Sequence, residues 1–315
     1  MFNLFPNLLI AVLFTCITSF ADTVYIDAGA YTSFPATIQS GTSGNWKVYI
    51  GKGQKPSDVS IRRNGDLNIS GSYIIFENMA FGQQEGLNGG ENVHLGGVHH
   101  IQFKKCRFFS VNTGTLTRSN PQTGDLLKFS QSNDILVEDC EFVNENSLVR
   151  GSVDQYWDNV NVHNVICRNN YFHDLYFSAS ACVQFKGGSY NVIIENCVFD
   201  SIGEASALRF GGGTGDQWIP DPAGAEGWDM TARNNVFINC PEQPVDVYNA
   251  RDIRIYNNTF IGCGGFGPSG TWESGAGILK AGGNPDLLTR AWTDSIWFIN
   301  NLMWNPNGDL KGVLD

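Results

Sequence analysis

The stretch NVIIENCVF, residues 191–199, recurs with small changes as DIRIYNNTF at 252–260 and as DILVEDCEF at 134–142. Each copy alternates apolar with variable residues, places Asn, Asp or Cys before its end, and closes on Phe. A period of two residues is typical of a β-strand and not of a helix. The stretch therefore predicts a strand followed by a tight turn, written several times along the chain.

Eight copies are found when each one is aligned on its last residue. These anchors are Phe81, Phe108, Phe142, Phe172, Phe199, Phe237, Phe260 and Met303. Two residues earlier stand Met79, Cys106, Cys140, Asn170, Cys197, Asn235, Asn258 and Asn301. We expect this second position to form a ladder at a turn, where Asn bonds backbone groups and tolerates the left-handed conformation. Such a unit cannot bury its own apolar face, so we expect stacked coils whose strands pair with their copies above and below.

The repeat resembles the right-handed parallel β-helix superfamily, the pectate-lyase-like solenoids, over roughly residues 45–303. We expect an all-β chain with one such domain at residues 22–315, carrying loop insertions. Within it, WDNVNVHN, KGG and GGGTG resemble a pattern of secreted bacterial β-helix proteins, at Asp158, His163, Lys186, Gly187, Gly188, Gly212, Thr214, Gly215 and Pro220. The superfamily contains lyases, hydrolases, epimerases and non-enzymatic adhesins, so the resemblance implies the fold more strongly than the reaction.

The first 21 residues predict a secretory signal peptide. They carry no charge and combine a short apolar run, Leu8 to Phe14, with the small-residue pattern Ser19-x-Ala21. We therefore expect a secreted protein, extracellular or periplasmic. The net charge of −11 argues against nucleic acid and anionic membranes as partners, and we expect a monomer.

Seven cysteines remain after residue 21, an odd number that leaves at least one thiol without a partner in the chain. Cys106, Cys140 and Cys197 occupy the turn ladder, where we interpret them as small buried residues. Cys240 and Cys263 follow their anchors by three residues in consecutive coils, so a disulfide across the coils is an alternative for that pair.

A second strand precedes each anchored strand and predicts a column of outward residues. Its members are His94, Lys128, Gln184, Arg209, Asp246 and Ile278, and two places further along come Gly96, Ser130, Lys186, Gly211, Tyr248 and Lys280. Taking Val160 and Val162 as inward places Asn161 and His163 outward in the intervening coil. Since neighbouring strands lie about 4.8 Å apart, we expect a local cationic strip on an acidic protein. An ordinary solvated strand face is the alternative.

The leading functional hypothesis is a polysaccharide lyase acting on a uronic-acid polymer such as alginate, pectate or a sulfated uronan. β-Elimination needs a cation or donor at the uronate carboxylate, a base for the neighbouring proton and an acid for the leaving oxygen. Arg209, Gln184 and Lys128 suit the first role, Lys186 or His163 the second, and Tyr248 the third. Further substrate-binding candidates are Asp246, His94, Asn161, Trp218 and Trp272, with Trp157 and Trp228 as other flat rings that could instead pack loops.

Two other functions stay open. A glycoside hydrolase needs two carboxylates at a defined separation, for which the sequence offers Asp246, with Asp158 and Glu204 nearby. A non-catalytic, carbohydrate-binding or adhesin-like solenoid fits the repeat equally. The one cofactor that the sequence suggests is Ca²⁺, which could take oxygen ligands from Asp216, Asp221, Glu226 and Asp229. The glycines of GGGTG indicate a sharp corner or a close approach, because the motif lacks the Lys-Ser/Thr ending of a phosphate loop.

Overall fold

The chain is a right-handed parallel β-helix, as the repeat predicted. A computed structural model describes residues 22–63, 65–83, 91–110, 124–145, 155–214, 218–219, 224–264, 277–282 and 293–304, without the side chains of 176–180 and 204–205. Within these residues the chain forms 26 strands and one short 3₁₀ helix, η1 (Pro56–Asp58). In the same residues no helix is long and apolar enough to cross a membrane.

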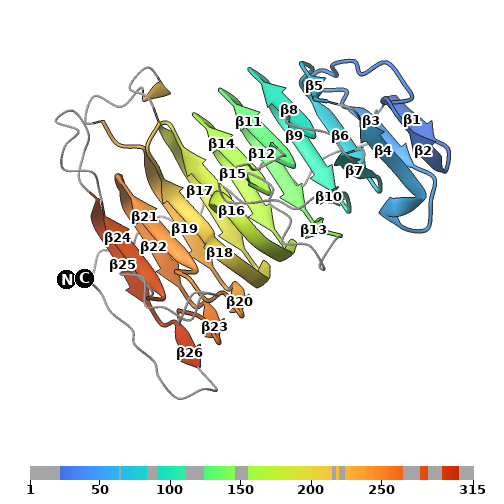
Figure 1. Cartoon of the computed structure of the whole chain (residues 1–315). Coiled ribbons are helices and arrows are strands. Elements are labelled where there is room, and N and C mark those ends of the chain that lie inside the picture. Colours follow the sequence, from blue (N-terminus) through green and yellow to red (C-terminus); the bar gives the residue numbers. More distant parts are fainter. Residues whose placement is uncertain are drawn as a thin grey trace.

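One face of the solenoid is a sheet of ten parallel strands, each contributed by a successive coil (Figure 1). In order they are β1 (Asp22–Ile26), β3 (Lys47–Gly51), β6 (Ile74–Glu77), β9 (His99–Lys104), β12 (Asn133–Glu138), β15 (His163–Arg168), β17 (Ser189–Glu195), β19 (Gly227–Arg233), β22 (Ala250–Tyr256) and β25 (Asp294–Ile299). The first coil thus begins at Asp22, well before the repeat becomes recognisable in the sequence.

A second face carries the anchored strands that follow the turn ladder. They are β2 (Gly29–Tyr31), β4 (Val59–Arg63), β7 (Ala80–Gln83), β10 (Arg107–Ser110), β13 (Glu141–Asn144), the first part of β16 (Tyr171–Lys186), the first part of β18 (Val198–Gly211), β20 (Val236–Ile238), β23 (Thr259–Ile261) and β26 (Leu302–Trp304). All neighbours in this stack pair in parallel.

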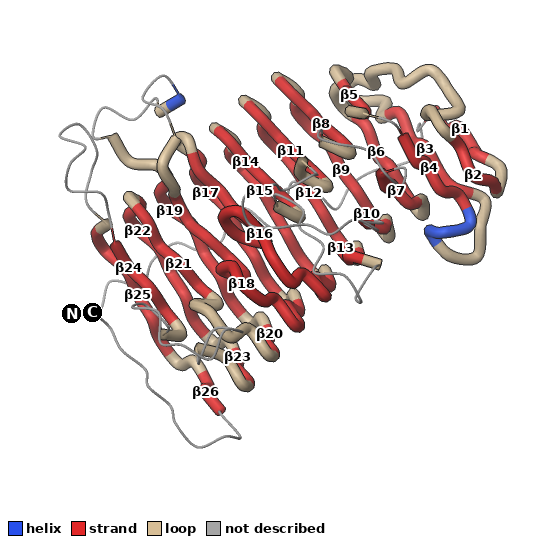
Figure 2. The backbone as a smooth tube through the Cα atoms, viewed as in Figure 1, coloured by secondary structure: helices blue, strands red, loops and turns tan. Residues whose placement is uncertain are grey.

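The third face holds the predicted column. Its strands are β5 (Leu67–Ile69), β8 (Val93–Gly96), β11 (Leu127–Ser130), β14 (Trp157–Val160), the ends of β16 and β18, β21 (Val245–Tyr248) and β24 (Leu279–Gly282). In two coils the chain runs through β16 and β18 from the second face to the third without leaving the strand conformation. These long strands join the second and third stacks into one sheet, as the continuous red segments show (Figure 2).

The anchors form a ladder through the core. The strand register pairs Phe81, Phe108, Phe142, Phe172, Phe199, Phe237, Phe260 and Met303 in that order, as predicted. From Phe81 to Phe260 the neighbouring rings stack with centroids 4.6–5.4 Å apart. Each ring is fully buried, and burying a Phe side chain is worth about 1.5–3 kcal/mol. Stacking therefore supplies the apolar contact that one coil lacks.

The Asn ladder bonds the backbone across coils, as expected. Asn258 donates from Nδ2 to the carbonyl of Ala232 at 3.0 Å, and its Oδ1 accepts the backbone N–H of Asn235 at 2.9 Å. The left-handed residue, however, is the one before the ladder position. Asn257, for example, has φ 55°. The prediction of a left-handed ladder residue was therefore wrong by one position, because the residue before the ladder position makes the turn.

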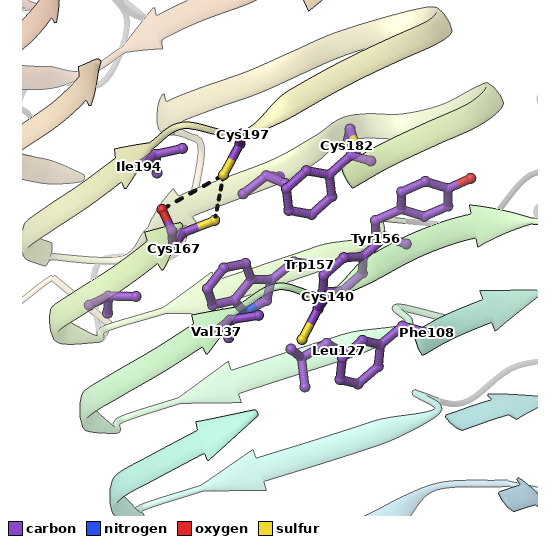
Figure 3. Close-up of a cluster of buried hydrophobic side chains, with 14 of the residues drawn as sticks. Phe108, Leu127, Val137, Cys140, Tyr156, Trp157, Cys167, Cys182, Ile194 and Cys197 are labelled. Atoms are coloured by element: carbon purple, nitrogen blue, oxygen red, sulfur yellow. Dashed lines mark hydrogen bonds between the residues drawn. The ribbon is translucent and has the colours of Figure 1, made fainter. Parts of the chain in front are cut away.

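The cysteines are buried residues of the core. All seven described cysteines are free, including Cys240 and Cys263, so the alternative of a disulfide between that pair is not found. Cys106, Cys140 and Cys197 fill the turn ladder as predicted, and Cys167 lies beside the last of them with Sγ atoms 3.7 Å apart (Figure 3). Trp157 points into the same interior and is fully buried, so it offers no flat face to a sugar.

Candidate functional site

The strand register places five predicted residues in one outward column on the third face. Over the described strands of this face the column reads Asn68, His94, Lys128, Asp158, Gln184, Arg209, Asp246 and Lys280. Two residues further along each strand, the second column reads Gly96, Ser130, Val160, Lys186, Gly211, Tyr248 and Gly282, where Gly211 follows Lys186 by continuing the register of Phe185 and Phe210 by one residue. The catalytic and binding roles given to these residues remain predictions.

Asn161 and His163 do not belong to this column, which corrects the alignment of their coil. Asp158 takes the place in the first column, because Trp157 and Asn159 point inward. Asn161 forms the corner after β14 with φ 55°, and His163 begins the strand on the next face. The misalignment came from Asn159, a polar residue that points inward. Its buried Nδ2 donates to the carbonyl of Gln184 at 3.1 Å, which the sequence pattern does not indicate.

The last member of the predicted column was also wrong by two residues. Lys280, and not Ile278, pairs with Asp246 on the neighbouring strand. Lys280 therefore stands in the first column beside Asp246, and glycine ends the second. Both Ile278 and Leu279 are buried, so their sequence alone does not say which one begins the strand.

Lys128 is held by carboxylates from three coils. Its Nζ lies 3.1 Å from Asp125, 3.2 Å from Asp158 and 3.2 Å from Glu91. Burial acts to lower the pKa of Lys128, but Asp125, Asp158 and Glu91 outweigh burial and raise it. Burial likewise acts to raise the pKa of Glu91, but Lys128 outweighs it and lowers that pKa. Lys128 is thus held as an ammonium and links three coils through its ion pairs.

Lys186 has a different environment, although it shares a partner with Lys128. Its Nζ lies 2.9 Å from Oδ1 of Asp158, which is its one ion-pair partner among the described residues, and its side chain keeps 22% of its surface exposed. Arg209, on the next coil, pairs through Nε with Oδ2 of Asp246 at 2.7 Å. Each of the three cations is therefore ion-paired, and the predicted excess of positive charge is not present. We call Glu91, Asp125, Lys128, Asp158, Lys186, Arg209 and Asp246 the charged ladder.

Gln184 and His94 are engaged with the protein. Gln184 is 2% exposed, donates from Nε2 to the carbonyl of Gly211 at 2.9 Å and accepts from Gln155, so it is not the outward-facing donor that we expected. His94 shares a hydrogen bond of 3.1 Å with Ser130. Trp218 lies half-buried in a short described segment, and Trp272 lies outside the described residues.

Gly211 separates Lys186 from Tyr248 in the second column. A Cβ at Gly211 would lie 1.9 Å from the carbonyl oxygen of Tyr248, and its φ is 88°, so both crowding and conformation require glycine. Gly211 thus permits a close approach of the neighbouring backbone, whereas Gly213 has nothing within 4 Å of an added Cβ, and the close approach of a ligand to GGGTG stays a prediction. No side chain then stands between Lys186 and Tyr248 in that column, while Arg209 projects from the same strand as Gly211.

The corner after Lys186 is fixed by a buried carboxylate. Glu226 accepts the backbone N–H of Gly187 at 2.8 Å through Oε2 and that of Thr214 at 2.6 Å through Oε1. Asp229 instead pairs with Arg254 at 2.7 Å. Asp216 and Asp221 lie outside the described residues, and the described ones contain no group of three or more acids, histidines or cysteines suited to a metal ion. Glu226 thus serves as a structural clamp of this corner, and calcium binding by this set of acids stays a prediction.

Sequence reasoning did not find Glu91 or Asp125. Both come at the start of the third-face strands, where loops of different length enter, so the repeat gives no alignment for them. The sequence named Asp158 as a position of the resemblance and as a carboxylate near the column, but not as a member of the column. Glu91 and Asp125 share one signal, an acid three residues before a column position, and it becomes informative only once the strand register is known.

Comparison with known proteins gives structural neighbours only. No family model and no curated sequence matches the chain. The chain is similar to an alginate lyase from Paenibacillus sp. str. FPU-7, with a TM-score of 0.57 and 12% identity over 92% of both chains. It is also similar to the catalytic domain of a GH87 α-1,3-glucanase bound to nigerose (TM-score 0.41, 11% identity, 91% of this chain and 62% of that chain).

A third neighbour is the A-module of a mannuronan C-5 epimerase from Azotobacter vinelandii (TM-score 0.34, 11% identity, 90% of this chain and 87% of that chain). By their names, all three are carbohydrate-active enzymes. The similarity to the alginate lyase, at 12% identity and a TM-score of 0.57, establishes the fold alone.

Proposed function

We propose that the chain is a secreted, carbohydrate-active protein that cleaves an anionic, uronic-acid-containing polysaccharide by β-elimination at the charged ladder. One observation carries the proposal. Lys186 and Tyr248 flank the side-chain-free position of Gly211, and Arg209 projects from the strand that carries that glycine. Elimination beside a uronate carboxylate needs cations that neutralise the carboxylate, a base that takes the neighbouring proton and an acid that protonates the leaving oxygen. In this arrangement Lys186 and Arg209 supply the cations, and the Tyr248 oxygen takes the proton as a phenolate and returns it to the leaving oxygen as a phenol. The alginate lyase that shares the fold supports the same reaction class.

The ion pairs suggest how the roles divide. Lys186 is already held by Asp158, and an ion-paired ammonium attracts an anionic substrate without having to lose a proton. We therefore assign neutralisation of the uronate carboxylate to Lys186 and Arg209. Neutralising that carboxylate stabilises the negative charge that develops when the neighbouring proton leaves.

Proton transfer falls to Tyr248 in this scheme. Its side chain is half-buried and follows Gly211 in the second column. His163 lies on the ten-stranded face, so Tyr248 takes the proton-transfer role that the sequence suggested for His163. Lys128 is left out of the chemistry, because three carboxylates hold it as an ammonium.

A hydrolase is the second candidate, and a specific observation favours it. Asp125 and Asp158 are each at most 3% exposed and approach the same nitrogen of Lys128 from neighbouring coils. Glycoside hydrolysis requires two carboxylates at a defined separation across the scissile bond. In this reading, Lys128 sets the separation of the pair.

The test uses ultraviolet absorbance, which reports the unsaturated product of elimination, together with a reducing-end assay on the same samples. The mature chain is incubated with alginate, polygalacturonate, glycosaminoglycans and ulvan. We expect absorbance to rise with one polymer and the rate to fall at least about 100-fold in Lys186→Met and in Tyr248→Phe. Lys52→Met is the matched control, because Lys52 forms an exposed ion pair with Asp27 on the first coil.

Two outcomes would redirect the proposal. Reducing ends without absorbance, lost in Asp158→Asn, would establish hydrolysis in place of elimination. Retention of a polymer without either signal would establish a binding solenoid, with the charged ladder as its docking face.

A further inference from the structure

Three aromatic side chains stack on the ten-stranded face. His163 on β15, Tyr190 on β17 and Trp228 on β19 occupy one register position of consecutive coils. The rings of His163 and Tyr190 have centroids 4.8 Å apart at 3°, and those of Tyr190 and Trp228 are 4.8 Å apart at 5°. All three are half-buried on the outside of the solenoid. We call them the aromatic strip.

The polar edges of the aromatic strip are unused by the protein. Among the described residues, no side-chain hydrogen bond or ion pair engages the imidazole of His163, the hydroxyl of Tyr190 or the indole N–H of Trp228. Packing alone would be served by rings without polar atoms, and the buried ladder uses Phe at seven positions for that purpose. Tyr and Trp whose rings pack while their polar atoms stay free are typical of interaction surfaces.

A rigid corner connects the strip to the charged ladder. From Lys186 the chain turns through Gly187 and Gly188, with φ 64° and 84°, and reaches Tyr190 within four residues. Ser189 donates from Oγ to the carbonyl of Lys186 at 2.7 Å and accepts the backbone N–H of Val162 at 3.1 Å. The clamp residue Glu226, which binds Gly187, lies two positions before Trp228. The same set of bonds therefore fixes Lys186, Tyr190 and Trp228 relative to one another.

The neighbouring residues suit an anionic ligand. Beyond the two ends of the strip, the same register position holds Asn133 next to His163 and Arg251 next to Trp228. No carboxylate occupies this column from Asn133 to Arg251, and Asp294 follows Arg251 on β25. Three ring edges with N–H or O–H groups, spaced by one strand each, thus form a row of donors that can reach successive hydroxyl and carboxylate oxygens of an extended chain.

We propose that the aromatic strip is a second contact surface for the same anionic polysaccharide, which crosses the corner at Gly187 after it leaves the charged ladder. The inference rests on the proposed function for the identity of the ligand. The strip binds polymer sugars beyond the reacting one by donating hydrogen bonds from its edges. It therefore contributes to affinity for long chains and takes no part in bond cleavage.

The test separates hydrogen bonding from stacking. Tyr190→Phe and Trp228→Phe keep an aromatic ring at each place and remove only the polar edge, so the fold is preserved. Tyr171→Phe is the matched control, because Tyr171 also stacks on a histidine, His173, with centroids 4.0 Å apart on the second face. Affinity electrophoresis in gels that contain each uronan gives binding without requiring cleavage.

We expect the Tyr190→Phe, Trp228→Phe double variant to bind the polymer about tenfold more weakly than the wild type, and Tyr171→Phe to bind normally. Where the polymer is cleaved, KM for polymer rises and kcat stays constant. The rate on a short oligosaccharide does not change.

The two proposals fail in different ways. Normal affinity and KM in the double variant, with cleavage intact, overturns the aromatic strip and leaves the lyase standing. Weaker binding in the double variant, with no cleavage of any polymer by the wild type, supports the strip and overturns the lyase. Absence of binding to every polymer by the wild type overturns both.

Discussion

Lys186 and Asp158 form an ion pair of 2.9 Å that joins two neighbouring coils, and the other oxygen of the same carboxylate lies 3.2 Å from Lys128. Asp158 thus connects Lys128, which contacts three carboxylates, to Lys186, which contacts one carboxylate among the described residues. Asp158 therefore links the coils of the charged ladder, and the first prediction concerns this residue.

Replacing Asp158 by Asn removes the charge that both lysines share. Because the carboxylate is 3% exposed, we expect Asp158→Asn to lower the free energy of unfolding by about 2–3 kcal/mol. Asp229→Asn breaks the exposed pair with Arg254 and should cost less than about 1 kcal/mol. Urea denaturation measures both, and equal losses in the two variants would contradict a special role for Asp158.

The Asn ladder gives a second prediction. Asn258 is 1% exposed and bonds the carbonyl of Ala232 and the backbone N–H of Asn235, so Asn258→Leu leaves both groups unpaired in the core. We expect it to cost about 2–4 kcal/mol. Asn258→Cys should cost clearly less, since Cys fits the same ladder position at Cys140 and Cys197. Thermal and urea unfolding of both variants would show the order, and a Cys variant as unstable as the Leu variant would speak against it.

The pH dependence of stability should carry the signature of His173. Burial acts to lower the pKa of His173, but hydrogen bonds to Glu141 and Asp174 outweigh burial and raise it above 6.5. His173 therefore stabilises the folded state fully below pH 6.5, and this stabilisation is lost as the pH rises through the folded pKa of His173. The hydrogen bond with His173 lowers the pKa of Glu141 against the effect of burial, so the contribution of Glu141 is lost only as the pH falls through a folded pKa below 4.5.

We expect His173→Gln to remove the part of the stability loss that occurs above pH 6.5. Urea midpoints of the wild type and the variant, measured at closely spaced pH values from about 5.5 to 9, check this. Parallel curves across that range would show that His173 does not titrate with folding.

The glycine between Lys186 and Tyr248 gives a fourth prediction. Gly211→Ala places a Cβ against the backbone of Tyr248 at a positive φ, and we expect a loss of more than about 2 kcal/mol together with displacement of Tyr248. Gly97→Ala is the control, because Gly97 has φ 65° and nothing within 4 Å of the added Cβ. That variant should lose about 1 kcal/mol, the cost of the left-handed conformation alone. Urea denaturation compares the two.

The core could be predicted because its signal is local. The anchors from Phe81 to Met303 stand at fixed distances from their own turns, so one alignment gave the register of eight coils. The left-handed position was harder to place. Pairs such as Asn257-Asn258 offer two suitable residues, and only the bonds of Asn258 across coils tell which one keeps an ordinary φ.

The site was predicted less completely, because its charges come from different coils. Lys128, Arg209 and Asp246 could be aligned, since each lies between two inward apolar residues. Their partners could not. Glu91 and Asp125 enter from loops outside the repeat, and Asn159 is a polar residue that points inward. A cation whose acidic partners cannot be aligned in the sequence is predicted to be unpaired. For this reason the sequence predicted a cationic strip where the structure has an ion-paired ladder.

The cluster around Lys128 also bears on how the solenoid comes apart. In a linear array each coil contacts its neighbours alone, so coils can fray in sequence from either end. Glu91, Asp125 and Asp158 arrive from three successive turns and meet at one nitrogen, so none of these turns can detach without stranding charge in the interior. These ion pairs should make the middle coils of the molecule unfold as a single cooperative unit. The amide hydrogens of β8, β11 and β14 should therefore exchange with solvent at the same rate, and more slowly than those of the terminal coils.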